Sequence, residues 1–163
     1  MIKKIALGAF SLLFLMTLVA CGQSPDVTAN AKGNKMGEDS IKIGVNMELS
    51  GAVAAYGTAE YNGIKLAVKE INANGGIDGK KIELVVKDNK SEIAEASTTA
   101  TNLAVQNQVT TIIGPATSGA TAAASLESQK TGVPLLTPSG TQDDLTVNKD
   151  GSTKEFVFRT TFK

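Results

Sequence analysis

The chain has 163 residues, of which 42% are hydrophobic and 20% charged, so we expect one compact domain around a single core. Lys plus Arg equals Asp plus Glu at 16 each, which gives no long-range field to attract nucleic acid or an anionic surface. His and Trp are absent, and Cys occurs once. This inventory excludes imidazole catalysis, Cys/His zinc sites and disulfide frameworks, and no cofactor or metal is expected.

The first 20 residues have the pattern of a secretory signal peptide. Lys3 and Lys4 precede an almost uninterrupted apolar run over residues 5–19, and the small Ala20 follows. This run is shorter than the roughly 20 residues that a permanent transmembrane helix needs. Removal of residues 1–20 takes away two lysines and no acid, which leaves 14 basic and 16 acidic residues and a net charge of −2.

The single cysteine, Cys21, ends the sequence "LVAC", which resembles the lipobox of bacterial lipoproteins. In a lipobox the Cys is lipidated and becomes the first residue of the mature protein. The alternative is an ordinary residue beside a cleavage site, but the position of the only Cys favours lipidation. Residues 21–40 are polar and lack apolar periodicity, which indicates a flexible tether. We therefore expect an extracytoplasmic protein, anchored by lipid to the bacterial cell membrane.

Residues 41–163 alternate between strand-like and helix-like segments. Five short apolar runs predict strands at 41–49, 81–88, 109–114, 133–138 and 155–162. Three segments between these strands predict helices. The first covers residues 58–74, the second begins after Ser91, which is expected to be its N-cap, and the third covers residues 117–130. Such alternation is typical of right-handed βαβ units, so we predict an α/β fold with an open, mainly parallel sheet and helices on both faces.

The first two predicted helices each carry an apolar face at helical spacing. In the first, Gly75 and Gly76 supply the stop signal. The expected buried residues are Ile64, Ala67, Val68 and Ile71 in the first helix, and Ile93, Ala96, Ala100, Leu103 and Ala104 in the second.

Three turns, at residues 50–57, 114–121 and 137–141, follow the first, third and fourth predicted strands. In a parallel sheet these turns meet at the carboxyl edge, where small ligands bind. The second turn, "GPATSGAT", spaces its glycines as a phosphate-binding loop does, yet Ala120 and Thr121 stand where Lys and Ser or Thr are required. The three turns are therefore candidate binding loops, and the second does not read as a phosphate site.

What remains in the second turn is a helix start with free backbone N–H groups and the hydroxyls of Thr117, Ser118 and Thr121. Such a helix start can receive a carboxylate. The alternative is that Ser118 only caps its own helix.

The third turn, "TPSGT", adds Ser139 and Thr141 together with backbone carbonyls that can accept hydrogen bonds from an ammonium group. The two turns could therefore hold a zwitterion, although a simple Pro-Gly turn explains "TPSGT" equally well. Tyr56 could cover the apolar part of a ligand or merely the edge of the sheet. Asp88 reads as a solvated or capping carboxylate, and Asp143 with Asp144 as the start of a short helical turn. No anchored pair of carboxylates supports hydrolysis, so an enzyme is not expected.

From Ile41 to the end, the sequence resembles the N-terminal lobe of the branched-chain amino-acid-binding proteins of ABC importers, which have the type I periplasmic-binding-protein fold. The motifs that carry the resemblance are "GxxxxYG", "AVKEINANGGIDGKKIELVVKD", "IIGPATSGAT" and "PLLTPSGTQDDLT". The resemblance implies that Ser118 and its N–H receive the ligand carboxylate, that Thr141 contacts both polar groups and that Ser139 offers its carbonyl to the ammonium. It also implies that Tyr56 and the Ala116-Thr117 backbone line the pocket.

By the same resemblance, the protein is a solute-binding lipoprotein that takes leucine, isoleucine, valine or a related amino acid to an ABC permease in the membrane. Family members have a second lobe with an acidic partner for the ammonium, and residues 41–163 read as an incomplete first lobe. A ligand sensor of the same fold is one alternative. A carboxylate-dependent enzyme on a flavodoxin-like sheet is another, which the absence of His and of paired carboxylates disfavours.

Overall fold

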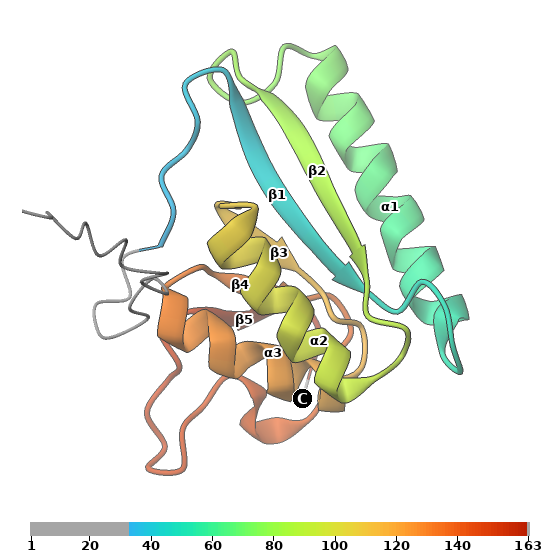
Figure 1. Cartoon of the computed structure of the whole chain (residues 1–163), viewed down its shortest axis with the longest axis vertical. Coiled ribbons are helices and arrows are strands. Elements are labelled where there is room, and N and C mark those ends of the chain that lie inside the picture. Colours follow the sequence, from blue (N-terminus) through green and yellow to red (C-terminus); the bar gives the residue numbers. More distant parts are fainter. Residues whose placement is uncertain (1–32, 163) are drawn as a thin grey trace, which may run out of the picture.

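The computed structural model describes residues 33–162, so the expected signal peptide and Cys21 lie outside the described residues. Five strands form one open, parallel sheet in the order β2-β1-β3-β4-β5 (Figure 1). The strands are β1 (Ser40–Met47), β2 (Lys81–Asp88), β3 (Thr111–Ile113), β4 (Leu135–Thr137) and β5 (Val157–Arg159). The predicted parallel α/β sheet is confirmed.

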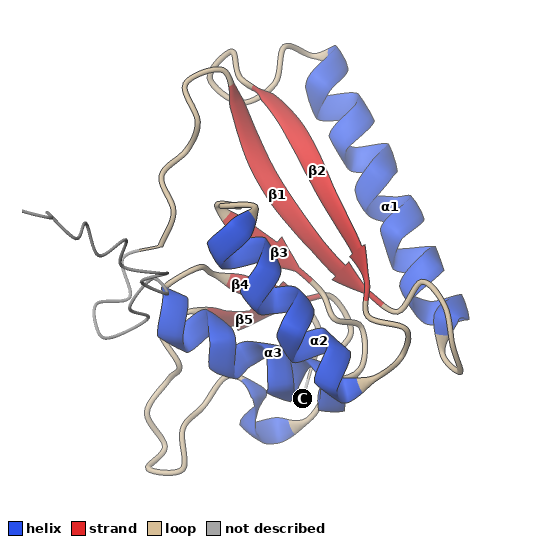
Figure 2. Ribbon diagram, in the orientation of Figure 1, coloured by secondary structure: helices blue, strands red, loops and turns tan. Residues whose placement is uncertain are grey.

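Helices cover both faces of this sheet, as predicted. The helical elements are α1 (Ala54–Ala73), α2 (Ile93–Thr101), the π-helical turn η1 (Asn102–Gln106), α3 (Ser118–Thr131) and the 3-10 turn η2 (Asp143–Leu145). Figure 2 shows α1 alone beside β1 and β2, with α2 and α3 together on the other side. None of the helices within residues 33–162 has both the length and the apolar character needed to cross a bilayer.

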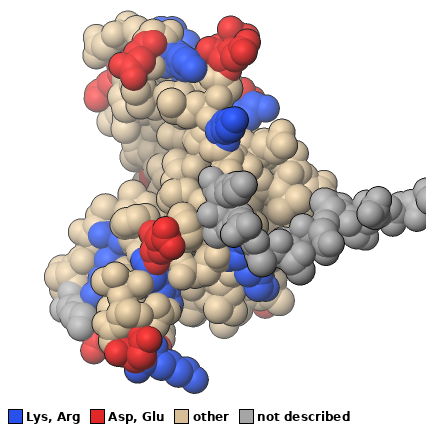
Figure 3. Space-filling view, turned by 90° about the vertical axis from the view of Figure 1, so that its left-hand side faces the viewer, with Lys and Arg blue, Asp and Glu red and all other residues tan. Residues whose placement is uncertain are grey.

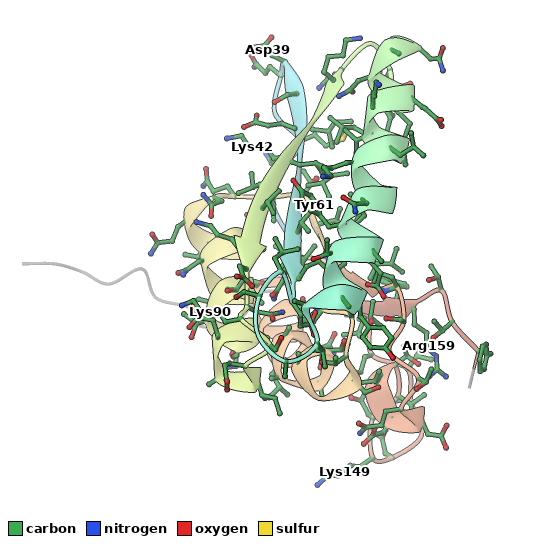
Figure 4. All side chains as sticks on the ribbon, turned by 90° about the vertical axis from the view of Figure 1, so that its right-hand side faces the viewer. Asp39, Lys42, Tyr61, Lys90, Lys149 and Arg159 are labelled. Carbon is green, nitrogen blue, oxygen red and sulfur yellow. The ribbon has the colours of Figure 1, made fainter. Side chains whose placement is uncertain are left out.

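Each face of the sheet has its own apolar core because successive side chains of a strand point to opposite faces. On the α1 face, Val45 and Met47 of β1 pack with Tyr61 and Ile64. The sticks in Figure 4 show Tyr61 on the side of α1 that meets the strands. The opposite face is formed by nine buried residues, Ala100, Leu103, Ala104, Val109, Ile112, Ala124, Val133, Leu135 and Val157. Both layers thus hold the carboxyl ends of β1, β3 and β4 in fixed positions.

The first helix begins four residues earlier than predicted and buries only part of the predicted face. Gly57, expected in a turn, is buried inside α1. Its missing side chain lets α1 lie directly on the backbone of Glu48, which a Cβ atom would meet at 2.7 Å from the carbonyl carbon. Of the residues expected to be buried, Ile64 packs on the core and Val68 is half-buried, whereas Ala67 and Ile71 are exposed.

The second helix also departs from the prediction at its start. Ser91 does not cap it: the N-cap residue is Glu92, and Ser91 has a φ of 63°. The Ser91 hydroxyl instead donates to the carbonyl of Ser50 at 2.6 Å and accepts from the N–H of Val53 at 3.2 Å. Ile93 is 59% exposed, whereas the other four residues of the predicted face are buried. Ser91 therefore holds the loop before α1 rather than its own helix.

Residues 33–39, which fall in the predicted tether, contact the folded lobe. The Asn34 side-chain amide donates to the carbonyls of Ala104 at 2.6 Å and Val109 at 2.9 Å. The Gly33 N–H donates to the Thr131 carbonyl at 3.3 Å. This part of the expected tether is thus tied to the α2/α3 side of the sheet.

Candidate functional site

The loops after β1, β3 and β4 meet at the carboxyl edge of the sheet, as the sequence predicts. They enclose a pocket of about 280 Å³. The lining residues are Val53, Tyr56, Ala116, Thr117, Ser118 and Ser139. Five of the six predicted ligand-binding residues therefore come together here, and Val53 joins them. Thr141 does not line the pocket, and it is exposed next to it.

A buried carboxylate that the sequence analysis missed holds the floor of the pocket. Glu48, directly after β1, is fully buried. Its Oε2 atom accepts from the N–H of Ala116 at 3.0 Å, and its Oε1 atom accepts from the N–H of Thr117 at 3.1 Å and from the Thr117 hydroxyl at 2.8 Å. Ala116 and Thr117 line the pocket, but their backbone N–H groups are already used by Glu48.

A second acidic residue, Glu60 of α1, contacts the loop after β4. The Ser139 hydroxyl lies within hydrogen-bond distance of Glu60 Oε1 and also 2.8 Å from the carbonyl oxygen of Ala116. Burial raises the pKa of Glu60; the hydrogen bond with Ser139 acts against this rise, and the nearby Glu48 adds to it. Glu60 lies four residues after Tyr56, and this spacing places both side chains on the same side of a helix. It was the sequence signal that could have pointed to Glu60.

Unpaired hydrogen-bond donors lie at the start of α3. The N-cap of this helix is Thr117, so Ser118 occupies its first turn and does not cap it. Among the described residues, the N–H groups of Ser118, Gly119 and Ala120 have no acceptor outside the helix. The Ser118 hydroxyl accepts from the N–H of Thr141 at 3.2 Å. This arrangement suits a carboxylate, which a helix N-terminus attracts through its free donors and its dipole.

The loop after β4 keeps one carbonyl free. The carbonyls of Pro138, Gly140 and Thr141 accept from the side chains of Thr160, Thr161 and Arg159, respectively. Within residues 33–162 the Ser139 carbonyl accepts no such bond. Ser139 therefore lines the pocket and also carries a free carbonyl oxygen. An ammonium group has only hydrogen-bond donors, so it needs acceptors of this kind.

Two hydroxyls that were expected to be available are used inside the fold. The Thr117 hydroxyl donates to Glu48, and Thr121 is fully buried. The Thr121 hydroxyl lies 2.8 Å from the Thr117 carbonyl and 3.2 Å from the Thr137 hydroxyl. These two residues therefore stabilise the turn before α3, and Ser118 is the pocket-lining residue of this turn whose hydroxyl hydrogen has no acceptor within residues 33–162.

Asp88 has a larger structural role than a solvated carboxylate. At the end of β2 it accepts from the N–H groups of Leu49, Ser50 and Lys90, and from the Ser50 hydroxyl at 2.6 Å. Its partial burial favours the neutral acid, but these four hydrogen bonds outweigh that effect and lower the pKa of Asp88. Asp88 thus fixes the loop that carries Val53 into the pocket.

The acidic side chains beside the pocket are engaged within the fold. Neither Glu48 nor Glu60 lines the pocket, and each is engaged with backbone or hydroxyl groups. Within residues 33–162 no group of three acidic or sulfur side chains gathers as a metal ion would require. Charged residues of both signs are interspersed on the face in Figure 3, so no single-sign patch suits a polyanion there.

Comparison with known proteins identifies the family. The family described as periplasmic binding protein matches residues 40–163. The chain belongs to the periplasmic binding protein family. As a periplasmic binding protein, it is 40% identical over 106 residues to the Leu/Ile/Val-binding protein BraC3 of Rhizobium johnstonii, covering 65% of this chain and 29% of that protein.

Two solved structures of substrate-binding proteins have the same lobe. The branched-chain amino acid transporter protein LivJ of Streptococcus pneumoniae, in complex with isoleucine, is 58% identical with a TM-score of 0.72 over 77% of this chain and 34% of LivJ. An ABC transporter substrate-binding protein of Desulfitobacterium hafniense, in complex with leucine, is 30% identical with a TM-score of 0.64 over 74% and 34%. This periplasmic binding protein chain spans about a third of these relatives. All three are named as binding proteins, in agreement with the expectation that the chain is not an enzyme.

Proposed function

We propose that the chain is the first lobe of an extracytoplasmic solute-binding protein that binds a branched-chain amino acid and delivers it to an ABC permease. The observation that carries this proposal is the pairing of free donors at the start of α3 with a free carbonyl on the loop after β4, across one pocket. A zwitterionic amino acid needs this pair of complementary groups. Sequence identity to LivJ, whose structure holds isoleucine, supports the choice of a branched-chain ligand.

Each pocket residue has a role under this proposal. Ser118 and the N–H groups beside it receive the carboxylate, and the Ser139 carbonyl receives the ammonium. Val53 and Tyr56 border the space left for an apolar side chain. Tyr56 is 67% exposed, so its ring is available to a ligand and to a second lobe that closes over it. Thr141 lies beside Ser118 and is placed to join these contacts when a ligand enters.

Ser118 provides a direct test of the binding role. In the full-length protein, Ser118→Ala removes a hydrogen bond to a charged carboxylate, an interaction worth about 1.5–3 kcal/mol, and we expect leucine affinity to fall about 10- to 150-fold. Titration calorimetry with leucine, isoleucine and valine measures this change. Ser97→Ala on α2 is the matched control and should bind like the wild type. Unchanged affinity in a correctly folded Ser118→Ala variant would contradict the proposed carboxylate site.

The lipid anchor is a separate part of the proposal and rests on the sequence alone. Cys21 is the single cysteine of the chain, at the position that a lipobox requires. Cys21→Ser removes the thiol that would be acylated, so the variant should leave the membrane or detergent phase in which the wild type is recovered. Phase partitioning of the two proteins measures this, with Ser24→Ala as the control. Equal partitioning of wild type and Cys21→Ser would rule out this anchor.

A further inference from the structure

The Ser139 hydroxyl has two acceptors but only one proton. It lies within hydrogen-bond distance of Glu60 Oε1 and 2.8 Å from the carbonyl oxygen of Ala116. A hydroxyl donates one hydrogen and accepts with its lone pairs. Both contacts can be hydrogen bonds at once only if one of the two partners donates to Ser139. The Ala116 carbonyl has no hydrogen to give, so the donor must be Glu60.

The other oxygen of Glu60 supports the same protonation state. Glu60 Oε2 is buried and has no hydrogen-bond partner among the described residues. A buried, unpaired oxygen is far more costly on a carboxylate than on a neutral carboxyl group. The ion pairs found within residues 33–162, Lys90–Glu95 and Lys130–Glu127, leave Glu60 without a cation to compensate a negative charge.

The charged groups around Glu60 also favour the neutral acid. Glu48, at the end of β1, raises the pKa of Glu60 by charge repulsion, in addition to the larger effect of burial. On α1 itself, Tyr56 shares a shallow surface with Glu60. At the end of β5, Arg159 is directed to the carbonyls of Thr141 and Gln142. The neighbouring loops thus supply no positive charge aimed at Glu60.

We propose that Glu60 is a positioning residue of the pocket and acts as a neutral hydrogen-bond donor. Its carboxyl O–H donates to Ser139 Oγ, and the Ser139 hydroxyl then donates to the Ala116 carbonyl. Glu48 accepts a hydrogen bond from the N–H of Ala116, and Glu60 acts through Ser139 on the carbonyl of Ala116. The two acidic side chains therefore fix both backbone polar groups of this residue. The consequence for amino-acid binding rests on the function proposed above, whereas the protonation of Glu60 does not.

The direction of the pH effect follows from the raised pKa. A carboxyl group whose pKa is higher in the folded chain contributes stability fully below its unfolded pKa, about 4.3, and loses that contribution as the pH rises through the folded pKa. Ionised Glu60 would also take the Ser139 proton for itself, which leaves the Ala116 carbonyl without its donor. Both stability and ligand affinity should therefore fall as Glu60 ionises.

Two variants separate the hydrogen-bond role from the bulk of the side chain. Glu60→Gln replaces the carboxyl O–H with an amide N–H donor that does not titrate, and Glu60→Ala removes the donor. Glu70→Gln is the matched control, because Glu70 is an exposed glutamate on the same helix. We would follow the carboxyl ¹³C shifts of the unliganded full-length protein through a pH titration and identify Glu60 by the resonance that Glu60→Gln lacks. Leucine affinity would be measured over the same pH range.

We expect Glu60 to titrate above its ordinary pKa and the leucine affinity of the wild type to fall about 3- to 10-fold as it ionises, the size expected for one lost hydrogen bond. Glu60→Gln should keep full affinity with a flat profile, Glu60→Ala should be weak throughout, and Glu70→Gln should follow the wild type. A Glu60 that titrates at or below its ordinary pKa overturns the inference, as does a Glu60→Gln variant no better than Glu60→Ala. Failure of every protein to bind leucine refutes the proposed function alone, because the ¹³C titration still decides the state of Glu60.

Discussion

Replacing Glu48 by Ala is expected to lower the free energy of unfolding by about 3–5 kcal/mol, a large part of the stability of a typical domain. The substitution removes three hydrogen bonds at once and leaves the N–H groups of Ala116 and Thr117 without their acceptor. A buried donor with no partner costs about 1–3 kcal/mol, which is why this change should exceed the usual effect of a point mutation. The floor of the pocket should also lose its fixed position.

Urea unfolding followed by circular dichroism measures this loss. Glu48→Gln keeps the shape of the side chain but turns one acceptor into a donor that faces another donor, so a loss of about 1.5–3 kcal/mol is expected. Glu83→Ala serves as the control because Glu83 is exposed on the neighbouring strand β2, and its effect should stay within about 0.5 kcal/mol. If Glu48→Ala unfolded at the same urea concentration as Glu83→Ala, the role assigned to Glu48 would be wrong.

Replacing Gly57 by Ala should destabilise the protein by about 2–3 kcal/mol even though Ala is the better helix former. A Cβ atom at this position lies 2.8 Å from the backbone nitrogen of Glu48 and 2.7 Å from its carbonyl carbon. Backbone atoms directly after the central strand β1 cannot turn aside as a flexible side chain can, so α1 has to move outward. That movement carries Tyr56 and Glu60 away from the pocket, and leucine affinity should fall with stability.

The same helix offers a control of opposite sign. At Gly63 an added Cβ atom meets nothing within 4 Å, so Gly63→Ala should stabilise the protein by about 0.5–1 kcal/mol through helix propensity alone. Thermal melts of the two variants, side by side, separate the packing effect from the propensity effect. A stabilising Gly57→Ala would show that α1 does not rest on β1 as closely as described.

The strands and their parallel direction could be predicted from local patterns, whereas the order of the strands in the sheet and the polar floor of the pocket could not. Alternating apolar residues and turn signals report on neighbours in the chain, which is why β2 is predicted to the residue. Glu48 forms its hydrogen bonds with residues 68 and 69 positions away, so its burial has no local signal. A charged residue at the end of a strand is normally exposed, so the sequence gives no reason to expect that Glu48 is buried.

Three further differences have the same non-local origin. Glycine is typical of turns, but Gly57 lies within α1, where the helix packs on the backbone directly after β1. Ser91 has the chemistry of an N-cap, yet its hydroxyl serves the loop 41 residues earlier. Ile93 fits the apolar period of α2, but no core element packs over it in the first turn, and its side chain is 59% exposed. In each case the tertiary surroundings of the residue, rather than its local preference, decide the outcome.

The register of β1 has a consequence for the newly made chain. Ser40 pairs with Lys81, and Ile43 pairs with Thr111, so both neighbours of β1 are synthesised after it. At roughly 5–20 residues per second, the first of these partners follows β1 by about 2–8 seconds. During this interval the run "IKIGVNM" has two unpaired edges and one charged residue, Lys42. A charged side chain inside an apolar strand disfavours pairing with the same strand of another chain, and Lys42 supplies such a charge within β1.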